Sequence, residues 1–220
     1  MELIGHRGCG SQYPENTVQA VRKAGQYLQT VEIDVRRCAS GELVVFHDET
    51  VDRLTGGSGA VADLSWTALR ELEVLDSGES IPRLSAVLEA VPAGVTAQIE
   101  LKESDIAADV RDVVTASAVD AHVTSFSPDA LASVADLSWS VPTGYLFESL
   151  PTANIETAID LECEYVHPHF DLCLETDVVE AAHDRGLSVI AWKAAKTSED
   201  VARVREAGVD GITADRWDIA

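Results

Sequence analysis

Short apolar or β-branched runs alternate with amphipathic stretches along most of the chain. The amphipathic stretches have a helical period, and several begin at Ser, Thr or Asp and end at Gly. These helical patterns cover residues 16–28, 81–91, 104–117, 127–137, 175–186 and 197–208. The apolar runs have the length and residue types of buried strands. They are residues 2–6, 30–34, 96–101, 122–126, 142–147, 164–168, 188–192 and 211–214.

Eight strands that alternate with helices are typical of a (β/α)8 TIM barrel. We therefore expect an α/β protein that forms a single domain over residues 1–220. Residues 51–80 add a glycine-rich loop and a short helix to this pattern. Because only residues 215–220 follow the last strand, the barrel is expected to close without a full final helix.

Residues 31–48 (VEIDVRRCASGELVVFHD) do not fit the alternation. They contain two strand-like runs joined by Ala39-Ser40-Gly41, which is too short for a parallel crossover. This pattern predicts a β-hairpin above the barrel mouth, with residues 34 and 46 facing each other. The register would bring together three polar side chains, which are Glu32, Asp34 and His47.

Composition indicates a protein with a large core and no membrane span. The chain is 46% hydrophobic, and no run reaches the ~18–20 apolar residues that a transmembrane helix needs. The N-terminus does not resemble a signal peptide, so we expect a soluble, cytoplasmic protein. Its cysteines lack C-x-x-C spacing, which favours buried free thiols over a zinc site or disulfides; they are Cys9, Cys38, Cys163 and Cys173.

The net charge of −22 and the pI near 4.4 argue against nucleic acid and anionic membranes as partners. The acidic residues are spread along the helical patterns, and arginine outnumbers lysine. This composition resembles that of proteins from high-salt cytoplasms, in which salt screens the repulsion between surface charges. The alternative is an ordinary acidic cytosolic protein.

Ionisable residues gather at the carboxyl ends of the predicted strands, where TIM barrels carry their catalytic groups. Glu32, Asp34 and Glu100 supply hard oxygen ligands, which suit Mg²⁺ or Ca²⁺ better than Zn²⁺. The alternative is that these acids form salt bridges with cationic neighbours, which are Arg7, Arg36 and Lys102.

Two histidines, His6 and His47, come from opposite sides of these carboxylates. A pair of imidazoles can divide the duties of general base and general acid near neutral pH. Arg7 and Lys102 add cationic donors, of which arginine suits bidentate contact with phosphate. A metal, two cations and two histidines describe phosphoryl chemistry on an anionic substrate.

The order of these motifs resembles the glycerophosphodiester phosphodiesterase family, within the phospholipase-C-like phosphodiesterase superfamily. The resemblance runs from residue 5 to about residue 215. The segments that carry it are His6-Arg7-Gly8, Pro14-Glu15-Asn16-Thr17, Glu32-Ile33-Asp34-Val35, Phe46-His47-Asp48, Ile81-Pro82-x-Leu84, Glu100-Leu101-Lys102 and Gly208-Val209-Asp210-Gly211-Ile212-x-x-Asp215.

The resemblance implies an enzyme that hydrolyses small-molecule glycerophosphodiesters to glycerol phosphate and an alcohol, with one divalent cation, Mg²⁺ or Ca²⁺. By the same resemblance His6 and His47 are catalytic, and Glu32, Asp34 and Glu100 bind the metal. Gly8 and Gly10 would let the backbone approach the substrate. Asn16 would cap the first helix or bind in the site, and Glu15 would hold Arg7 or lie near the metal; the alternative is that both residues only stabilise the loop. The implied substrate-binding residues are Arg7, Asn16, Lys102, Phe126 and Trp192.

The reaction implied by the family is intramolecular: the glycerol hydroxyl next to the phosphodiester attacks phosphorus, and water then opens a cyclic phosphate. Two alternatives are a phospholipase-type enzyme acting on lipids and a catalytically silent scaffold on the same barrel. The chain departs from the family where Lys193-Ala194-Ala195-Lys196 replaces the usual Thr-Val-Asn after Trp192. His167 and His169 match no family motif, and a structural role is favoured over a second metal site.

Overall fold

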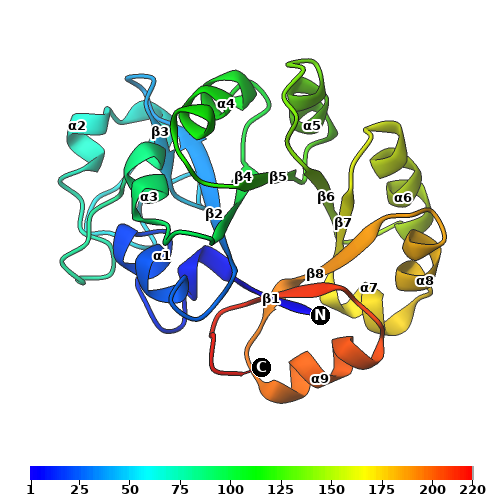
Figure 1. Cartoon of the computed structure of the whole chain (residues 1–220). Helices are drawn as coiled ribbons and strands as arrows, with labels where there is room; N and C mark the ends of the chain where they lie inside the picture. The colour runs from blue at the N-terminus through cyan, green and yellow to red at the C-terminus, as the bar shows by residue number, and fades with distance from the viewer. Residues whose placement is uncertain (220) are drawn as a thin grey trace.

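The computed structural model of the protein describes residues 1–219, without the side chain of Ala194. Eight parallel strands form a barrel, which closes because β1 pairs with both β2 and β9 (Figure 1). The predicted TIM barrel is therefore confirmed. The strands are β1 (Glu2–Gly5), β2 (Thr30–Arg37), β4 (Thr96–Leu101), β5 (Ala121–Ser125), β6 (Thr143–Phe147), β7 (Tyr165–Pro168), β8 (Ser188–Ala195) and β9 (Gly211–Ala214).

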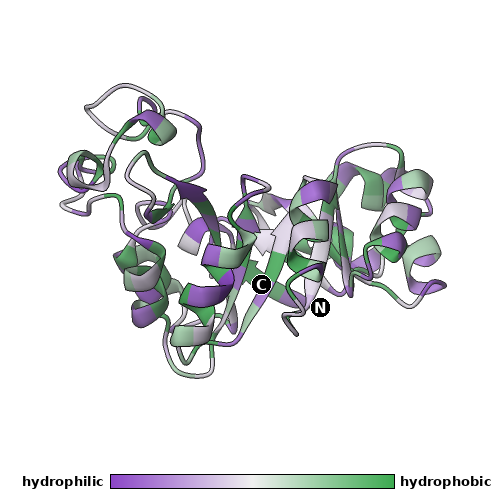
Figure 2. Ribbon diagram, turned by 90° about the horizontal axis from the view of Figure 1, so that it is seen from above, coloured by the Kyte–Doolittle hydropathy of each residue, from purple (hydrophilic) through white to green (hydrophobic). Residues whose placement is uncertain are grey.

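Helices surround the strands and carry both hydrophobic and hydrophilic residues along their length (Figures 1 and 2). They are α1 (Val18–Ala24), α2 (Trp66–Leu69), α3 (Leu84–Ala90), α4 (Ala107–Ala116), α5 (Pro128–Ala135), α6 (Pro151–Asp160), α7 (Phe170–Glu175), α8 (Val178–His183) and α9 (Ser198–Glu206). The sequence patterns did not single out α6 or α7. Only Ile155 and Ala158 of α6 are buried, and α7 has six residues, so neither has a strong apolar period.

The core lies between the outer faces of the strands and the helices. Ile33 of β2 and Ile99 of β4 are fully buried in one cluster with residues of the surrounding helices. Because successive strand residues point to opposite faces, the neighbours Glu32 and Glu100 turn into the barrel. The alternation that builds the core therefore also directs the carboxylates inward.

The predicted hairpin is present at the end of β2. Strand β3 (Leu43–Val45) pairs with it antiparallel, with Val35 opposite Val45. The Phe46 amide donates to the Asp34 carbonyl over 2.9 Å, so the predicted register is confirmed. A 3₁₀ turn (Val61–Asp63) and α2 follow and pack over a separate apolar cluster that includes Phe46.

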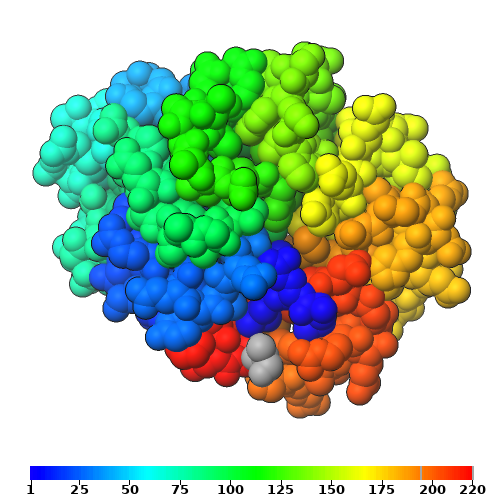
Figure 3. All heavy atoms as spheres, viewed as in Figure 1, coloured from blue at the N-terminus to red at the C-terminus, as the bar shows by residue number. Residues whose placement is uncertain are grey.

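After β9 the described chain contains no further helix, as the short C-terminal segment predicted. Instead, the Trp217 ring stacks on Tyr27 at a centroid distance of 3.8 Å. The Trp217 indole also donates to the Tyr13 hydroxyl over 3.1 Å. Figure 3 shows these last residues, in red, against the N-terminal residues, in blue. The segment after β9 thus packs against the residues that flank α1.

All four cysteines are buried and unpaired, as predicted. Among the described residues, no helix is long and apolar enough to cross a membrane.

The acidic surface leads to a prediction about salt. With 38 acidic and 16 basic residues, like charges repel one another in the folded state, and molar KCl screens that repulsion. We expect the melting temperature to rise by several degrees between low and molar KCl, since about 1 kcal/mol shifts it by roughly 2–4 °C at this size. Thermal melts followed by circular dichroism measure the shift. Near the pI of about 4.4 the rise should shrink, and an unchanged or lower midpoint in KCl at neutral pH would contradict the prediction.

Candidate active site

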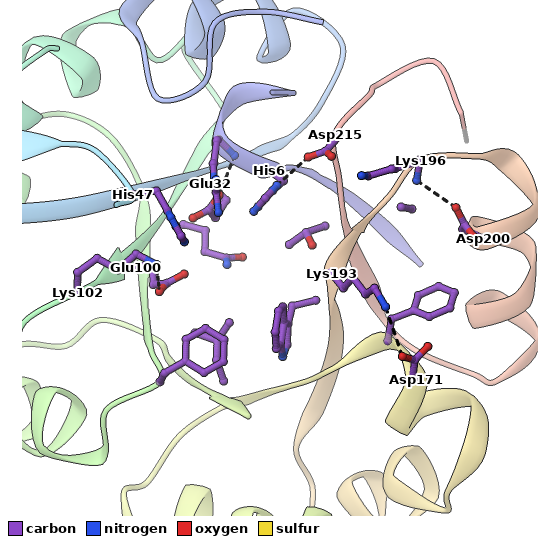
Figure 4. A pocket seen from close by; sticks show the side chains of 18 of the residues that line it. His6, Glu32, His47, Glu100, Lys102, Asp171, Lys193, Lys196, Asp200 and Asp215 are labelled. Carbon is purple, nitrogen blue, oxygen red and sulfur yellow. Dashed lines mark hydrogen bonds and ion pairs between the residues drawn. The ribbon is translucent and has the colours of Figure 1, made fainter. Parts of the chain in front are cut away.

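A cavity of about 550 Å³ opens at the carboxyl ends of the strands (Figure 4). Most of the predicted site residues line it. They are His6, Arg7, Glu32, His47, Glu100, Lys102, Phe126 and Trp192. Asp34 and Glu15 do not line the cavity but contact Arg7, which does, and Asn16 in turn donates to Asp34. The structure thus brings together segments that are far apart in the sequence.

The first strand ends in a 3₁₀ turn, His6–Gly8, whose backbone is unusual. Arg7 and Gly8 both have positive φ, and the Arg7 amide donates to Glu32 Oε2 over 2.7 Å. A Cβ atom on Gly8 would lie 2.8 Å from backbone and side-chain atoms of Ala20 in α1. Glycine at this position therefore also permits the close approach of helix α1.

His6 is held by Asp215, which follows β9. The distance from His6 Nδ1 to Asp215 Oδ1 is 2.8 Å. Burial disfavours the charged ring, but the hydrogen bond to Asp215 and the charge of Glu32 outweigh it, and the pKa of His6 is raised. Asp215 is a functional residue that the sequence patterns did not single out, although it ends the last family motif and directly follows a strand.

His47 has a different environment. Its Nδ1 lies 2.6 Å from Asp48 Oδ1, and Arg53 in turn donates to Asp48. Burial lowers the pKa of His47; the charge of Asp34 opposes this, while Lys102 adds to the lowering. The structure thus shifts the pKa values of the two histidines in opposite directions, upward for His6 and downward for His47.

Glu32, Asp34 and Glu100 each place an oxygen within 4.8 Å of the others, so they form a cluster that could hold a metal ion. Burial and the neighbouring Asp34 charge raise the pKa of Glu32 to about 8. Burial and Asp34 also raise the pKa of Glu100. The pKa of Asp34 is lowered despite burial, because Lys102 and Arg7 stabilise its charge.

Two of the three cationic neighbours form salt bridges with this cluster, as the salt-bridge alternative expected, but one carboxylate oxygen is left without a partner. Lys102 Nζ lies 2.9 Å from Asp34 Oδ1 and also contacts Glu100, while Arg7 Nε lies 3.3 Å from Asp34 Oδ2. Arg36 instead pairs with Glu103. Within residues 1–219, the buried Glu32 Oε1 has no hydrogen-bond partner.

The predicted loop Pro14–Thr17 supports the cluster from behind. Asn16 Nδ2 donates to Asp34 Oδ2 over 2.7 Å, and Asn16 Oδ1 accepts from the Asp34 amide. The N-cap of α1 is Thr17, so the interpretation of Asn16 as the cap is wrong. The backbone explains why: Asn16 has a φ of 59°, whereas Thr17 has the extended conformation of an N-cap residue. Glu15 Oε1 accepts from Arg7 over 2.9 Å and from Arg53 over 2.9 Å.

Aromatic side chains form one wall of the cavity. Phe126 and Trp192 meet edge to face at a centroid distance of 5.0 Å, and Phe126 is 41% exposed. The Trp192 indole donates to the Phe147 carbonyl over 2.9 Å, which fixes its ring. His169 also meets Trp192 edge to face at a centroid distance of 4.8 Å, and its ring nitrogen accepts from the Asp171 amide to cap α7.

His167 lies inside the barrel, fully buried, and neither ring nitrogen has a partner in the described part of the chain. Burial lowers the pKa of His167 to about 3, and that of the adjacent His122 to about 4. Neither histidine belongs to a cluster of three or more potential metal ligands among residues 1–219. The Nε2 atom of His167 would lie 2.5 Å from a Cβ on Gly144, so this glycine makes room for the ring.

This geometry places the protein among the TIM-barrel enzymes, whose reactive groups lie at the carboxyl ends of the strands. Residues 6–219 match the model of the glycerophosphoryl diester phosphodiesterase family. The chain therefore belongs to the glycerophosphodiester phosphodiesterase family, and it is an enzyme that hydrolyses glycerophosphodiesters.

Individual relatives cover almost the whole chain. A glycerophosphodiester phosphodiesterase of Caldanaerobacter subterraneus subsp. tengcongensis is 30% identical over 97% of this chain and 93% of its own length. A solved phosphodiesterase of Oleispira antarctica, in complex with the product sn-glycerol-3-phosphate, is 26% identical with a TM-score of 0.91, over 98% of this chain and 93% of that one. The solved glycerophosphodiester phosphodiesterase of Thermotoga maritima is 26% identical with a TM-score of 0.85, over 99% of this chain and 96% of that one.

Proposed function

We propose that the protein is a metal-dependent phosphodiesterase that converts a glycerophosphodiester to glycerol phosphate and an alcohol through a cyclic phosphate. The observation that carries this proposal is the pair of histidines at one cavity whose pKa values are shifted in opposite directions. Such a pair supplies an acid and a base at the same pH. The solved relative with bound sn-glycerol-3-phosphate supports the product.

Glu32, Asp34 and Glu100 would hold the cation. The buried Glu32 Oε1, which has no partner in the described chain, supports this fit, as do burial and the Asp34 charge, which together raise the pKa of Glu32 and Glu100. Carboxylate oxygens are the ligands that Mg²⁺ and Ca²⁺ prefer. When bound, a divalent cation supplies positive charge that stabilises the phosphoryl group during the reaction.

The two histidines divide the proton transfers. His47, whose pKa is lowered, accepts the proton of the glycerol hydroxyl next to the phosphodiester as its oxygen bonds to phosphorus. His6, whose pKa is raised, gives its proton to the departing alcohol as the other P–O bond breaks. In the second step His6 accepts a proton from water, which attacks phosphorus, and His47 returns its proton to the glycerol oxygen.

The remaining groups bind and orient. Arg7 and Lys102 line the cavity and carry the charges that neutralise the phosphate. Asp215 and Asp48 hold the two rings by their Nδ1 atoms. Asn16 positions Asp34, and Glu15 positions Arg7. Phe126 and Trp192 provide the wall against which the glycerol moiety packs.

Replacing either His6 or His47 with alanine is expected to lower kcat/KM by about 10²–10⁴-fold, the usual contribution of a positioned general acid or base. In the wild type, kcat/KM should rise with pH as His47 loses its proton and fall as His6 loses its proton. His47→Ala should remove the acidic limb of this profile, and His6→Ala the alkaline limb. The assay measures glycerol phosphate released from glycerophosphocholine, glycerophosphoglycerol and glycerophosphoethanolamine.

The control variant is His183→Ala, which removes a partly exposed histidine that pairs with Asp210 away from the cavity. It should keep the wild-type rate and profile. Absence of glycerol phosphate from all three diesters would overturn the proposed function. Two histidine variants that retain wild-type rates would overturn the roles of His6 and His47.

A further inference from the structure

The end of the cavity away from Lys102 and Glu100 is also cationic. Lys193 and Lys196 lie there at the end of β8 (Figure 4), and Arg203 of α9 lines the same cavity. Three of the four lysines in the chain, Lys102, Lys193 and Lys196, line this one cavity. In a chain with 38 acidic and only 16 basic residues, such a concentration of cations points to an anionic ligand.

The backbone at the end of β8 is irregular. Ala191 pairs with Ile212 and Ala195 with Ala214, so residues 192–194 of β8 stand opposite the single residue 213 of β9. Lys193 within this bulge has a φ of 83°, which is uncommon for a residue with a side chain. Bulges at barrel rims re-aim side chains near active sites, and strained residues persist where the surroundings hold them. This is also the segment in which the chain departs from the family pattern.

The carboxylates at this end do not neutralise the cations. Lys193 Nζ lies 3.4 Å from Asp171 Oδ2. Asp200 accepts from the backbone amides of Lys196 and Thr197, as part of the capping box of α9. Over residues 1–219, neither the Lys196 ammonium nor the Arg203 guanidinium forms an ion pair with a carboxylate. Three cations therefore lie beside Asp171 and Asp200, and the third carboxylate at this end, Asp215, pairs with His6.

The cations lie on the side of the cavity from which the alcohol departs in the proposed function. Asp215, which holds the ring of His6, donates its amide to the Ala195 carbonyl over 3.2 Å. Asp215 thus links the His6 ring, through Nδ1, to the end of β8. The proposed function places the phosphate by Arg7 and Lys102 and the glycerol moiety against Phe126 and Trp192, so the cationic end is the part of the cavity that remains for the departing alcohol.

We propose that Lys193, Lys196 and Arg203 form a subsite for the departing alcohol that selects an anionic group on it, a phosphate or a carboxylate. This proposal rests on the proposed function and names its substrate class. A phosphate or carboxylate accepts charge-assisted hydrogen bonds from the two ammonium groups and the guanidinium. A quaternary ammonium on the alcohol meets like charge instead, so choline is disfavoured at this position.

The test uses three glycerophosphodiesters whose alcohols share a two-carbon linker and differ only in the terminal group. The alcohols are ethylene glycol monophosphate, ethylene glycol and choline. At one fixed ionic strength, kcat/KM is expected to be highest for the phosphate and lowest for choline. In the double variant Lys193→Gln with Lys196→Gln, the preference for phosphate over hydroxyl should fall about tenfold, as charge-assisted hydrogen bonds are lost.

Two control variants accompany it. The double variant Lys193→Arg with Lys196→Arg keeps both charges and should keep most of the preference. Arg205→Gln removes an exposed charge from the same helix as Arg203, outside the cavity, and should change neither rate nor preference. If the ethylene glycol diester is hydrolysed as well as the diester with the terminal phosphate, the subsite alone is overturned. A preference for phosphate that survives the double glutamine variant would have the same consequence. Failure to hydrolyse any of the three diesters would overturn the proposed function and, with it, this subsite.

Discussion

Removal of divalent cations with a chelator is expected to abolish hydrolysis, and readdition of Mg²⁺ or Ca²⁺ to restore it. Three buried carboxylates lie within reach of one ion, whereas the nearby cations, Arg7 and Lys102, both pair with Asp34. Burial and the repulsion from the charge of Asp34 raise the pKa of Glu32 to about 8. A bound divalent cation removes this repulsion, because it favours the ionised carboxylates.

The measurement combines initial rates in chelator with calorimetric titration of each cation into the chelated protein. Glu32→Gln should weaken cation binding and activity together, because it removes a charged ligand whose Oε1 has no other partner in the described chain. Glu89→Gln, which removes an exposed carboxylate from α3, serves as the matched control and should bind the cation as the wild type does. A metal-free preparation with full activity at high chelator concentration would contradict the prediction.

Most of the fold follows from local patterns in the sequence. Runs such as 96–101 and 211–214 have the length and β-branched content of buried strands, and the structure places strands at those same residues. The hairpin register followed from the length of the turn alone. Helices α6 and α7 were not singled out, because they are held by their contacts with neighbouring strands rather than by a strong apolar period of their own.

The site was harder to predict in detail than the fold. Position at strand ends was enough to bring His6, Glu32 and Glu100 together, since parallel strands end at one rim. The partners of the two histidines required three-dimensional information: Asp215 lies 209 residues from His6 in the sequence, and only barrel closure through β9 brings them within 2.8 Å. The cationic end of the cavity depends on a bulge in β8, which no periodic pattern of hydrophobic residues encodes.

Removal of the glycerol hydroxyl next to the phosphodiester is expected to leave binding largely intact and to slow the reaction by roughly 10³-fold or more. In the proposed reaction this hydroxyl is the nucleophile. Effective molarities of about 10⁵ M for such intramolecular attack exceed the concentration of liquid water by roughly 10³-fold, which sets the expected effect. The two substrates to compare are diesters of propane-1,3-diol, which lacks the adjacent hydroxyl, and of propane-1,2-diol, which retains it. They are isomers with the same charge, so size and electrostatics are matched.

The same pair of substrates reports on the histidines. With the 1,2-diol, phosphorus NMR should detect a transient cyclic phosphate, whose opening depends on the return of the proton from His47. In His47→Ala both the formation and the opening of the cyclic phosphate should slow. In His6→Ala the formation of the cyclic phosphate should recover for a diester whose alcohol is acidic enough to depart without a proton. Comparable rates for the two isomers, with no cyclic species, would mean that water attacks phosphorus directly. His47 would then deprotonate water rather than a hydroxyl of the substrate, while His6 would still give its proton to the departing alcohol.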